Sequence, residues 1–207
     1  MKPVALGFRM HSGWGVLVAI SGNADSPTVV DRRRIVVMDP ATRGGNQPYH
    51  YAAELTPEKA EQYIAKCGVL SASMAQEAIK QVFVELSERN YHVASAAVLM
   101  AAGRSLPPLP QILASHPLIH AAEGEFFRKS VIGACESLKI PVTQIREREV
   151  EERAKCAHGK KAGQVVRNIA ALGSSIGPPW TADHKAATLA ALLTLKIGQT
   201  ASLSNSG

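Results

Sequence analysis

Short apolar runs separated by turn residues dominate the first forty positions of the chain. Val4–Met10 and Trp14–Ile20 are mostly apolar, and Thr28–Met38 is rich in valine. Ser12-Gly13 and the cluster Ser21–Asp25 divide these runs with residues that favour turns. Short turns join antiparallel neighbours, so the pattern predicts three consecutive antiparallel strands.

Helical spacing replaces this strand pattern after residue 55. Thr56-Pro57-Glu58 combines a capping residue, a proline at the first helical position and an acid near the positive helix end. This start predicts a helix that ends at Gly68. A longer helix is expected from Ser73, where Gln76 completes a capping box. Its apolar face consists of Ala75, Ile79, Val82 and Leu86.

The second half alternates between strands and helices. Val93–Ala101 is nearly all apolar and predicts a buried central strand. Leu106–Pro110 is rich in proline and predicts an irregular loop that runs to Pro117. The remaining expected elements are a helix at Leu118–Leu138, a strand at Pro141–Ile145, and helices at Glu147–Ala157, Lys160–Leu172 and Ala182–Lys196.

The order of these elements predicts an α/β fold with a mixed sheet. A strand, a helix and a second strand in succession suggest a right-handed parallel crossover, with helices on both faces. Residues 1–199 are expected to form one domain, followed by a flexible tail at 200–207 that is polar and rich in small residues.

Composition narrows the class of protein. Hydrophobic residues make up 46% and charged residues 19%, a mixture that fills a core and excludes a disordered chain. The formal net charge of +6 favours polyanionic partners. Three cysteines without zinc or redox spacing favour a reducing compartment. Arg9 and His11 interrupt the first apolar run, so no signal peptide is expected. The run from Val16 to Ile20 is too short to span a bilayer, so no membrane partner is expected and the predicted location is cytoplasmic.

Several segments resemble the RuvC family of Holliday-junction resolvases, which have the ribonuclease-H-like fold. Ala5–Phe8 followed by Gly13–Leu17 resembles the opening hairpin of that family. Ala122–Val142 resembles the helix and strand that follow its second acidic position. Lys160–Leu172 and then Pro178–Asp183 resemble its closing segment, in which a helix starts at an acid and continues with small residues.

The resemblance implies a cluster of carboxylates that holds two divalent ions for phosphodiester cleavage. Most of these positions are not acidic here. The first falls on Arg9, which cannot lose its proton or bind a metal. The second falls near Met100–Ala102, where no carboxylate is present. Asp183 matches the first closing acid, and the next one falls on Ala186. The sequence therefore predicts that two-metal nuclease activity has been lost.

Asp183 and Glu123 remain the candidate catalytic and metal-binding acids. Asp183 is interpreted either as a relic of the metal site or as an acid of the first helical turn. Glu123 shares a helical stripe with Phe127, so it either points toward the sheet, where Arg9 or a metal would balance it, or lies in solvent. His11 and His184 are histidines that could join Asp183.

Two further histidines have ligand chemistry at helical spacing with Glu123. His116, His120 and Glu123 stand four and three residues apart. Pro117 is expected to leave His116 outside the helix, and a third clear ligand is missing, so no metal site is predicted there. No phosphate-binding glycine motif occurs, so no nucleotide cofactor is expected.

Basic residues give the candidates for nucleic-acid contacts. Arg32 and Arg34 share one face of the third expected strand, with Arg33 on the other face, and Lys160 and Lys161 add positive charge later in the chain. A solvated face is the alternative interpretation.

Two functions follow from these observations. The first is a module that binds nucleic acid or another protein, without nuclease activity and without a cofactor. The alternative is a nuclease dependent on Mg²⁺ or Mn²⁺, with a rearranged site of Asp183, Glu123 and a histidine such as His11. A second copy of the chain is a further candidate partner.

Overall fold

A computed structural model of the protein describes residues 1–101 and 105–204, with side chains up to residue 195. Its centre is a five-stranded sheet in the order β3-β2-β1-β4-β5. The strands are β1 (Lys2–Met10), β2 (Trp14–Gly22), β3 (Pro27–Val36), β4 (Tyr91–Met100) and β5 (Val142–Arg146). The first three pair antiparallel, and β1, β4 and β5 run parallel, so the expected mixed α/β sheet is confirmed.

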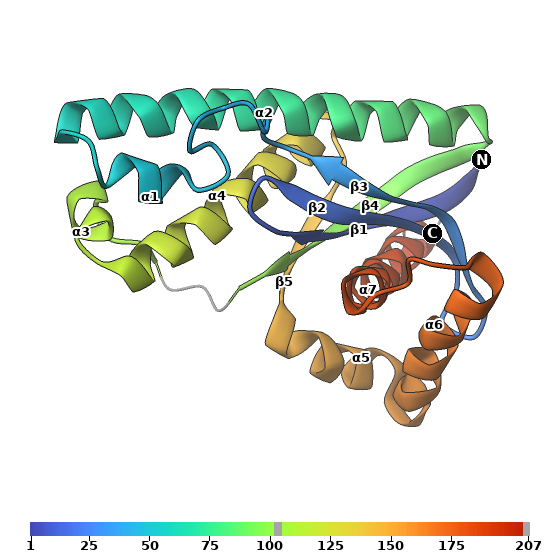
Figure 1. Ribbon diagram of the computed structural model, residues 1–207. Helices are drawn as coiled ribbons and strands as arrows, with labels where there is room; N and C mark the ends of the chain where they lie inside the picture. Colours follow the sequence, from blue (N-terminus) through green and yellow to red (C-terminus); the bar gives the residue numbers. More distant parts are fainter. Residues whose placement is uncertain (102–104, 205–207) are drawn as a thin grey trace.

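Helices cover both faces of this sheet (Figure 1). One face carries α2 (Pro57–Glu88) and α4 (His116–Ser137), with the short helices α1 (Pro48–Ala52) and α3 (Leu109–Leu113) beside them. The other face carries the 3₁₀ turns η1 (Glu147–Glu149) and η2 (Gly159–Lys161) together with α5 (Val150–His158), α6 (Ala162–Ile176) and α7 (Ala182–Ser204).

Alternation along β1 decides which side chains meet which helices. Val4, Leu6 and Phe8 lie in the core shared with α2 and α4. Ala5 lies in the core shared with α5, α6 and α7. Successive side chains of a strand point to opposite faces, so Arg9 belongs to the α7 face with Ala5.

The close packing of α7 on β1 depends on Gly7. A Cβ atom at this position would lie 1.9 Å from the carbonyl oxygen of Ala187. No side chain fits at that distance, so glycine allows the helix backbone to rest directly on the strand. This contact positions the start of α7, including Asp183, over the end of β1.

Three predicted elements differ from the structure. The two helices expected around Gly68 are one continuous helix of 32 residues. Its buried stripe runs through Cys67 and Ser71 to Ala75, and burial of that stripe outweighs the cost of one helical glycine, about 1 kcal/mol. The expected loop after Leu106 contains α3, because proline is tolerated in a first helical turn. Finally, α7 continues to Ser204, past its expected end, and residues 205–207 of the expected tail lie outside the described residues.

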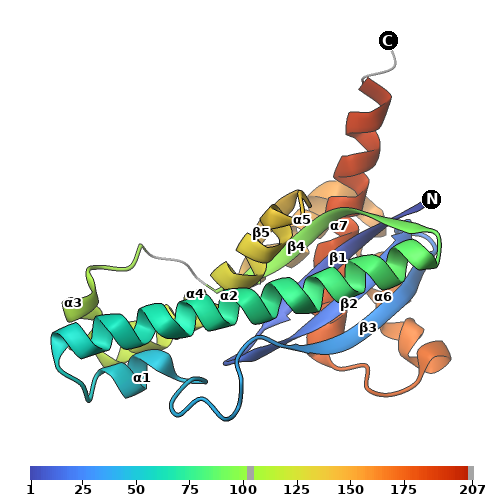
Figure 2. The same cartoon turned by 90° about the horizontal axis from the view of Figure 1, so that it is seen from above.

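The first halves of α2 and α4 extend beyond the sheet, and α1 and α3 pack against them there (Figures 1 and 2). Ile112, Ile119 and Ala122 form a small core of this part, with Tyr49 against them. Among the helices that the structure describes, none is long and apolar enough to cross a membrane.

Candidate functional site

The parallel strands β1, β4 and β5 all end at the same edge of the sheet, and a group of charged side chains gathers there. Arg9 is the second-last residue of β1, Glu147 directly follows β5, and Asp183 lies in the first turn of α7. We refer to Arg9, His11, Glu147 and Asp183 as the strand-end cluster.

Arg9 joins the two carboxylates of the strand-end cluster. One terminal nitrogen of its guanidinium donates to Oδ1 of Asp183. The other terminal nitrogen, Nη2, donates to Oε2 of Glu147 at 3.1 Å. The side chain of Asp183 is 20% exposed and that of Arg9 is 29% exposed, so this double ion pair is partly shielded from water. A guanidinium therefore stands between the acids that could otherwise hold a cation.

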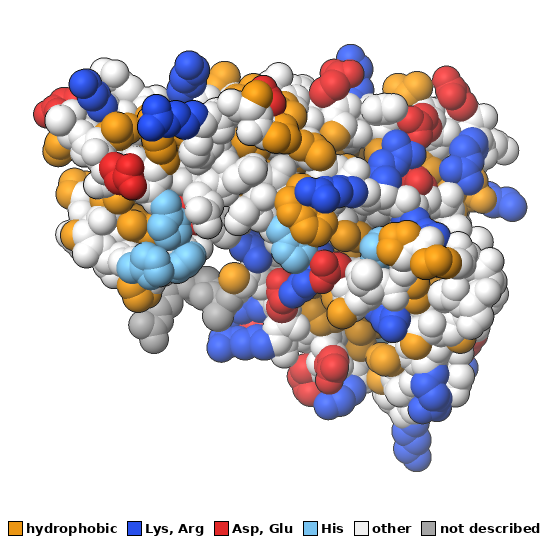
Figure 3. Space-filling view, in the orientation of Figure 1, with side chains coloured by type: hydrophobic (Ala, Val, Ile, Leu, Met, Phe, Trp, Pro, Cys, Tyr) orange, Lys and Arg blue, Asp and Glu red, His pale blue; other side chains and the backbone are white. Residues whose placement is uncertain are grey.

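His11 extends the cluster toward β2. Its Nε2 donates to Oδ2 of Asp183 at 2.9 Å, so both oxygens of this carboxylate have a partner. The imidazole also stacks on Trp14, with ring centroids 4.4 Å apart. Arg34 of β3 lies over the same indole, with its guanidinium carbon 4.1 Å from the ring centroid. An aromatic and cationic surface thus borders the strand-end cluster. Figure 3 shows hydrophobic, basic and histidine side chains side by side in the middle of this face of the molecule.

Partner charges set the titration of these groups. Burial would raise the pKa of Asp183, but the hydrogen bond from His11 and the charge of Arg9 outweigh it and leave that pKa below its usual value. Burial would likewise lower the pKa of Arg9, and the hydrogen bonds and charges of Glu147 and Asp183 raise it instead. Both groups are therefore ionised at neutral pH.

Arg128 of α4 reaches the same edge from the other side of the sheet. Its Nε donates to the carbonyl oxygen of Leu99 at 2.8 Å, next to the end of β4. Its Nη2 lies 3.8 Å from Oε1 of Glu147. Burial, together with the nearby charge of Arg9, lowers the pKa of Arg128, although the charge of Glu147 opposes this shift. Two arginines thus face the two acids at this edge.

Glu123 does not take part in this cluster. Its side chain is 4% exposed, so the solvent alternative is wrong, but it is buried against α1 rather than against the sheet. The predicted partner Arg9 is also wrong, because Oε1 of Glu123 accepts hydrogen bonds from Nδ1 of His50 at 2.9 Å and from the backbone N–H of His50 at 3.2 Å. The physical reason is position: Glu123 lies in the first half of α4, which extends beyond the sheet and packs against α1, whereas Arg9 points to the α7 face of the sheet.

The basic residues proposed for nucleic-acid contacts are not gathered at one place. Arg32 and Arg33 point to opposite faces of β3, as predicted: Arg33 pairs with Asp31 and with Glu85 of α2. Arg32 instead holds the segment before α7. Its guanidinium donates to the carbonyl oxygens of Ile176, Gly177, Pro178 and Pro179.

Lys160 and Lys161 lie at the other end of the strands. Lys161 pairs with Asp25 in the turn between β2 and β3, with Nζ 3.2 Å from Oδ1. The start of β2, with Trp14, borders the strand-end cluster, so this turn is at the opposite edge of the sheet. Arg34 is exposed and is the proposed nucleic-acid residue that borders the strand-end cluster.

His184 is buried at the start of α7 and serves that helix end. Its Nδ1 lies 2.8 Å from the hydroxyl oxygen of Thr181. Burial and the charge of Arg32 lower the pKa of His184, although the charge of Asp183 opposes this shift. His11 rather than His184 is therefore the histidine that binds Asp183.

Ala186 and Arg9 line one pocket of about 360 Å³ between the sheet edge and helices α5, α6 and α7. Glu147 and Lys185 supply further charge, while Leu99, Val150 and Ile169 supply much of the apolar wall. The second acid of the family was expected near Met100–Ala102. The structure describes this stretch as far as Ala101, where no acid is present, and residue 102 lies outside the described residues.

Two residues of interest escaped the sequence analysis. Glu147 was assigned to a helix without a role, although an acid directly after a parallel strand lies at the same edge as the end of β1. His50 stands in a segment without clear periodicity, and its contact with α4 is purely tertiary. No sequence signal would have joined His50 to Glu123.

Known proteins match this chain at the level of structure, whereas no family model and no curated protein matches it. RuvC of Thermus thermophilus matches with a TM-score of 0.51 at 12% identity, over 95% of this chain and 96% of that one. T. thermophilus RuvC in complex with a Holliday junction substrate matches equally well, over 95% of each chain. The chain has the ribonuclease-H-like fold of RuvC. The yeast mitochondrial Holliday junction resolvase Ydc2 also matches, with a TM-score of 0.43 at 13% identity, over 98% of this chain and 80% of that one.

The RuvC fold confirms the resemblance that the opening hairpin and the closing segment suggested. It also agrees with the predicted mixed sheet, since the match extends over nearly all of both chains. At 12% identity the match concerns the fold, and function has to be argued from the site itself.

Proposed function

We propose that this protein is a nucleic-acid-binding domain with the RuvC fold that does not cleave phosphodiesters by a two-metal mechanism. The observation that carries the proposal is the position of Arg9 between Asp183 and Glu147. Divalent ions need oxygen ligands with uncompensated negative charge, and here Arg9 pairs with both acids while Arg128 lies 3.8 Å from Glu147. A guanidinium cannot be deprotonated to make room for a metal.

The nucleic-acid part of the proposal rests on charge, aromatic surface and fold. The chain carries a net charge of +6, and Arg34 is exposed beside Trp14 and His11. Arginine contacts phosphates, and an indole beside it offers a face on which a base can stack. One structural neighbour is RuvC in complex with a Holliday junction substrate, so branched DNA is the first ligand to test.

The rearranged nuclease remains the second candidate, because Asp183, Glu147 and His11 still place two carboxylates and an imidazole at one strand edge. Glu123, which that hypothesis needed, binds His50 of α1 in the part of the molecule that extends beyond the sheet. Cleavage assays with Mg²⁺ and Mn²⁺ on four-way junctions, duplexes and single strands are expected to give no product. Metal-dependent cleavage that disappears in Asp183→Ala would establish the second candidate instead.

Binding is tested by fluorescence anisotropy with the same three DNA forms over a range of salt concentrations. The logarithm of the affinity is expected to fall linearly with the logarithm of the salt concentration. Arg34→Ala should weaken binding and reduce this slope by about 1, the effect of one lost phosphate contact. Arg33→Ala is the matched control, since it removes the same charge from the other face of β3, where Asp31 and Glu85 hold it. Absent or salt-independent binding would favour a protein partner.

A further inference from the structure

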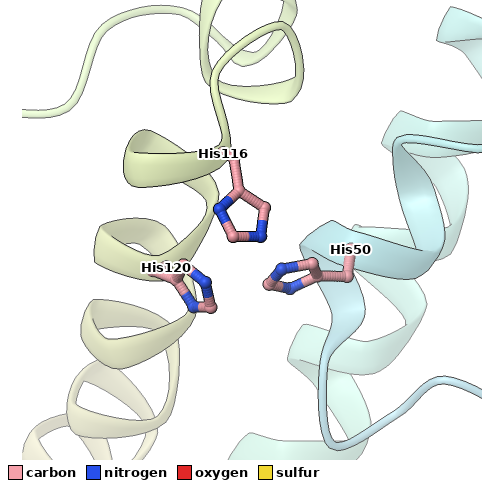
Figure 4. Close-up of side chains that lie close together, drawn as sticks. All are labelled: His50, His116 and His120. Carbon is pink, nitrogen blue, oxygen red and sulfur yellow. The ribbon is translucent and has the colours of Figure 1, made fainter.

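Three histidines meet in the part of the molecule that extends beyond the sheet. His50 comes from α1, and His116 and His120 stand one turn apart at the start of α4. Each offers one ring nitrogen, and these three nitrogens all lie within 4.8 Å of one another. Figure 4 shows the three rings arranged around a common space. We call His50, His116 and His120 the histidine cluster.

The relative orientation of the rings suits convergence on one atom. The centroids lie 4.4 to 5.2 Å apart, and the ring planes are inclined by 64 to 86°. The rings are therefore not stacked face to face, and one nitrogen of each ring lies within 4.8 Å of the other two. Around a tetrahedral ion with metal–nitrogen bonds of about 2.0 Å, ligand nitrogens stand roughly 3.3 Å apart. Small side-chain rotations close the remaining difference, and His116 and His120 are exposed enough to make them.

Glu123 prepares His50 for such a role. An ionised carboxylate only accepts hydrogen bonds, so its contact with Nδ1 places the proton of His50 on that nitrogen. The lone pair of His50 is then on Nε2, at the outer end of the ring. Carboxylates of this kind orient metal-binding histidines and raise their basicity. The backbone N–H of His50 bonds to the same oxygen and fixes α1 against α4.

The scaffold around the cluster is packed. Pro48 and Ala52 of α1 are buried. Tyr49 meets Phe126 of α4 edge to face, with centroids 6.0 Å apart. The histidines therefore stand on two helices held together by apolar contacts and by the buried carboxylate of Glu123, as a pre-formed site requires.

We propose that His50, His116 and His120 bind one divalent transition-metal ion of the zinc class, with Glu123 orienting His50. Three imidazole nitrogens suit Zn²⁺, Co²⁺, Ni²⁺ and Cu²⁺, whereas Mg²⁺ and Mn²⁺ prefer oxygen ligands. The site thus differs in chemistry from the strand-end cluster and is independent of nucleic-acid binding. Because His116 and His120 are exposed, a fourth coordination position faces solvent and can hold water or an exchangeable ligand.

Metal binding here links α1 to α4, so it also stabilises the folded chain. An ion that binds the folded state and not the unfolded one raises the melting temperature in proportion to the logarithm of its concentration. Protons compete for the same nitrogen lone pairs, so the affinity is expected to fall as the pH is lowered.

The test is a titration of the full chain, first stripped with EDTA, with Zn²⁺ by calorimetry and with Co²⁺ by absorption spectroscopy. We expect one Zn²⁺ per chain and a visible Co²⁺ spectrum of tetrahedral type. His120→Ala, which changes an exposed side chain, should weaken Zn²⁺ binding by more than about 100-fold, and Glu123→Gln by about 10-fold. His92→Ala removes an exposed histidine of β4 outside the cluster and should leave the affinity unchanged.

Three results would overturn the proposal. The first is Zn²⁺ binding to the wild type that is no tighter than to the His50→Ala, His120→Ala double variant. The second is an octahedral Co²⁺ spectrum that is identical in both proteins. The third is an equal loss of affinity in His92→Ala, which would indicate scattered surface binding. Circular dichroism of each stripped variant verifies that the fold is retained, so a loss of binding is assigned to the ligand set.

Discussion

The strand-end cluster and the histidine cluster both bring metal-binding side-chain types together, yet their charges differ completely. At the strand ends, two acids face Arg9, with His11 and Arg128 nearby, so negative and positive groups are already balanced. In the histidine cluster, three imidazoles face one another and a single buried carboxylate stands behind one of them. In the strand-end cluster, Arg9 already occupies the place between the possible ligands. In the histidine cluster, no cationic side chain of the described residues lies between the three ring nitrogens, as we propose for a site that binds a metal ion from solution.

This contrast shows that residue types alone do not define a metal site. Asp183, Glu147 and His11 have suitable atoms, but an arginine that cannot be deprotonated occupies their centre. His50, His116 and His120 include no acid, and neutral imidazole is a good ligand for zinc-like ions. What decides between the two is the charge already present among the ligands.

The largest expected effect comes from a substitution that disturbs the region of the strand-end cluster and leaves the histidine cluster intact. Gly7→Ala places a Cβ atom 1.9 Å from the carbonyl oxygen of Ala187, so α7 must move off β1. We expect the free energy of unfolding to fall by about 3 kcal/mol, measured by urea denaturation. Zinc affinity should change less than about twofold, because the histidine cluster lies on helices of the opposite face.

Gly133→Ala is the matched control for this substitution. Gly133 lies in α4, and a Cβ atom there would meet nothing within 4 Å. Alanine is the better helix former, so this variant should be stabilised by up to about 1 kcal/mol. A joint loss of stability and zinc binding in Gly7→Ala would show that the two regions are coupled.

A smaller effect is expected from removing the central cation of the strand-end cluster. Arg9→Leu leaves Asp183 and Glu147 close together without their shared partner. Hydrogen bonds to charged groups contribute about 1.5 to 3 kcal/mol, and partial exposure favours the lower end, so we expect a loss of about 2 kcal/mol. The double variant Arg9→Leu, Asp183→Leu should recover part of this loss, as measured by a double-mutant cycle.

This cycle also sharpens the comparison with the histidine cluster. If Arg9 acts as the internal cation, Arg9→Leu should bind divalent ions at the strand ends more tightly than the wild type does. A calorimetric titration with Mn²⁺ measures this gain. An additive cycle, with no coupling between Arg9 and Asp183, would contradict the role assigned to their ion pair.

The smallest expected effect is on the free energy of unfolding at low pH. Because the pKa of Asp183 is lowered in the folded protein, its ionised form contributes stability above its unfolded pKa of about 3.9. That contribution is lost as the pH falls through the folded pKa. The stability difference between wild type and Asp183→Asn should therefore be constant at neutral pH and shrink below about pH 4, as followed by urea denaturation. A difference that stays constant down to pH 2 would show that the charge of Asp183 contributes nothing.

Most of the fold could be predicted because local sequence patterns indicate where its strands and helices lie. Apolar runs, turn residues and helical stripes located all five strands, and their order predicted the mixed sheet. The break expected at Gly68 failed because a glycine signal is local, whereas the stripe through Cys67, Ser71 and Ala75 packs along the whole of α2. The helix α3 was missed because proline is a breaker inside a helix and acceptable in its first turn.

The candidate site could be predicted in part. Arg9 and Asp183 were singled out from the sequence, and their ion pair joins the first strand to the last helix. Arg9, one of the two partners considered for Glu123, was wrong because the packing of α1 on α4 places His50 against this carboxylate. His50 had no signal at all, since it meets His116 and His120 through the packing of α1 on α4.

By itself, the sequence determined where the strands and helices lie along the chain, that positions 9 and 186 are not acidic, and which side chains are of a type that binds metals. These depend on residue identity and on periods of two or 3.6 residues, which a linear chain carries. Only the tertiary structure decided that Arg9 pairs with Asp183 and Glu147, and that His50 lies beside His116 and His120. Those outcomes depend on which faces of helices and strands meet, because contacts between distant segments form only when the core is packed.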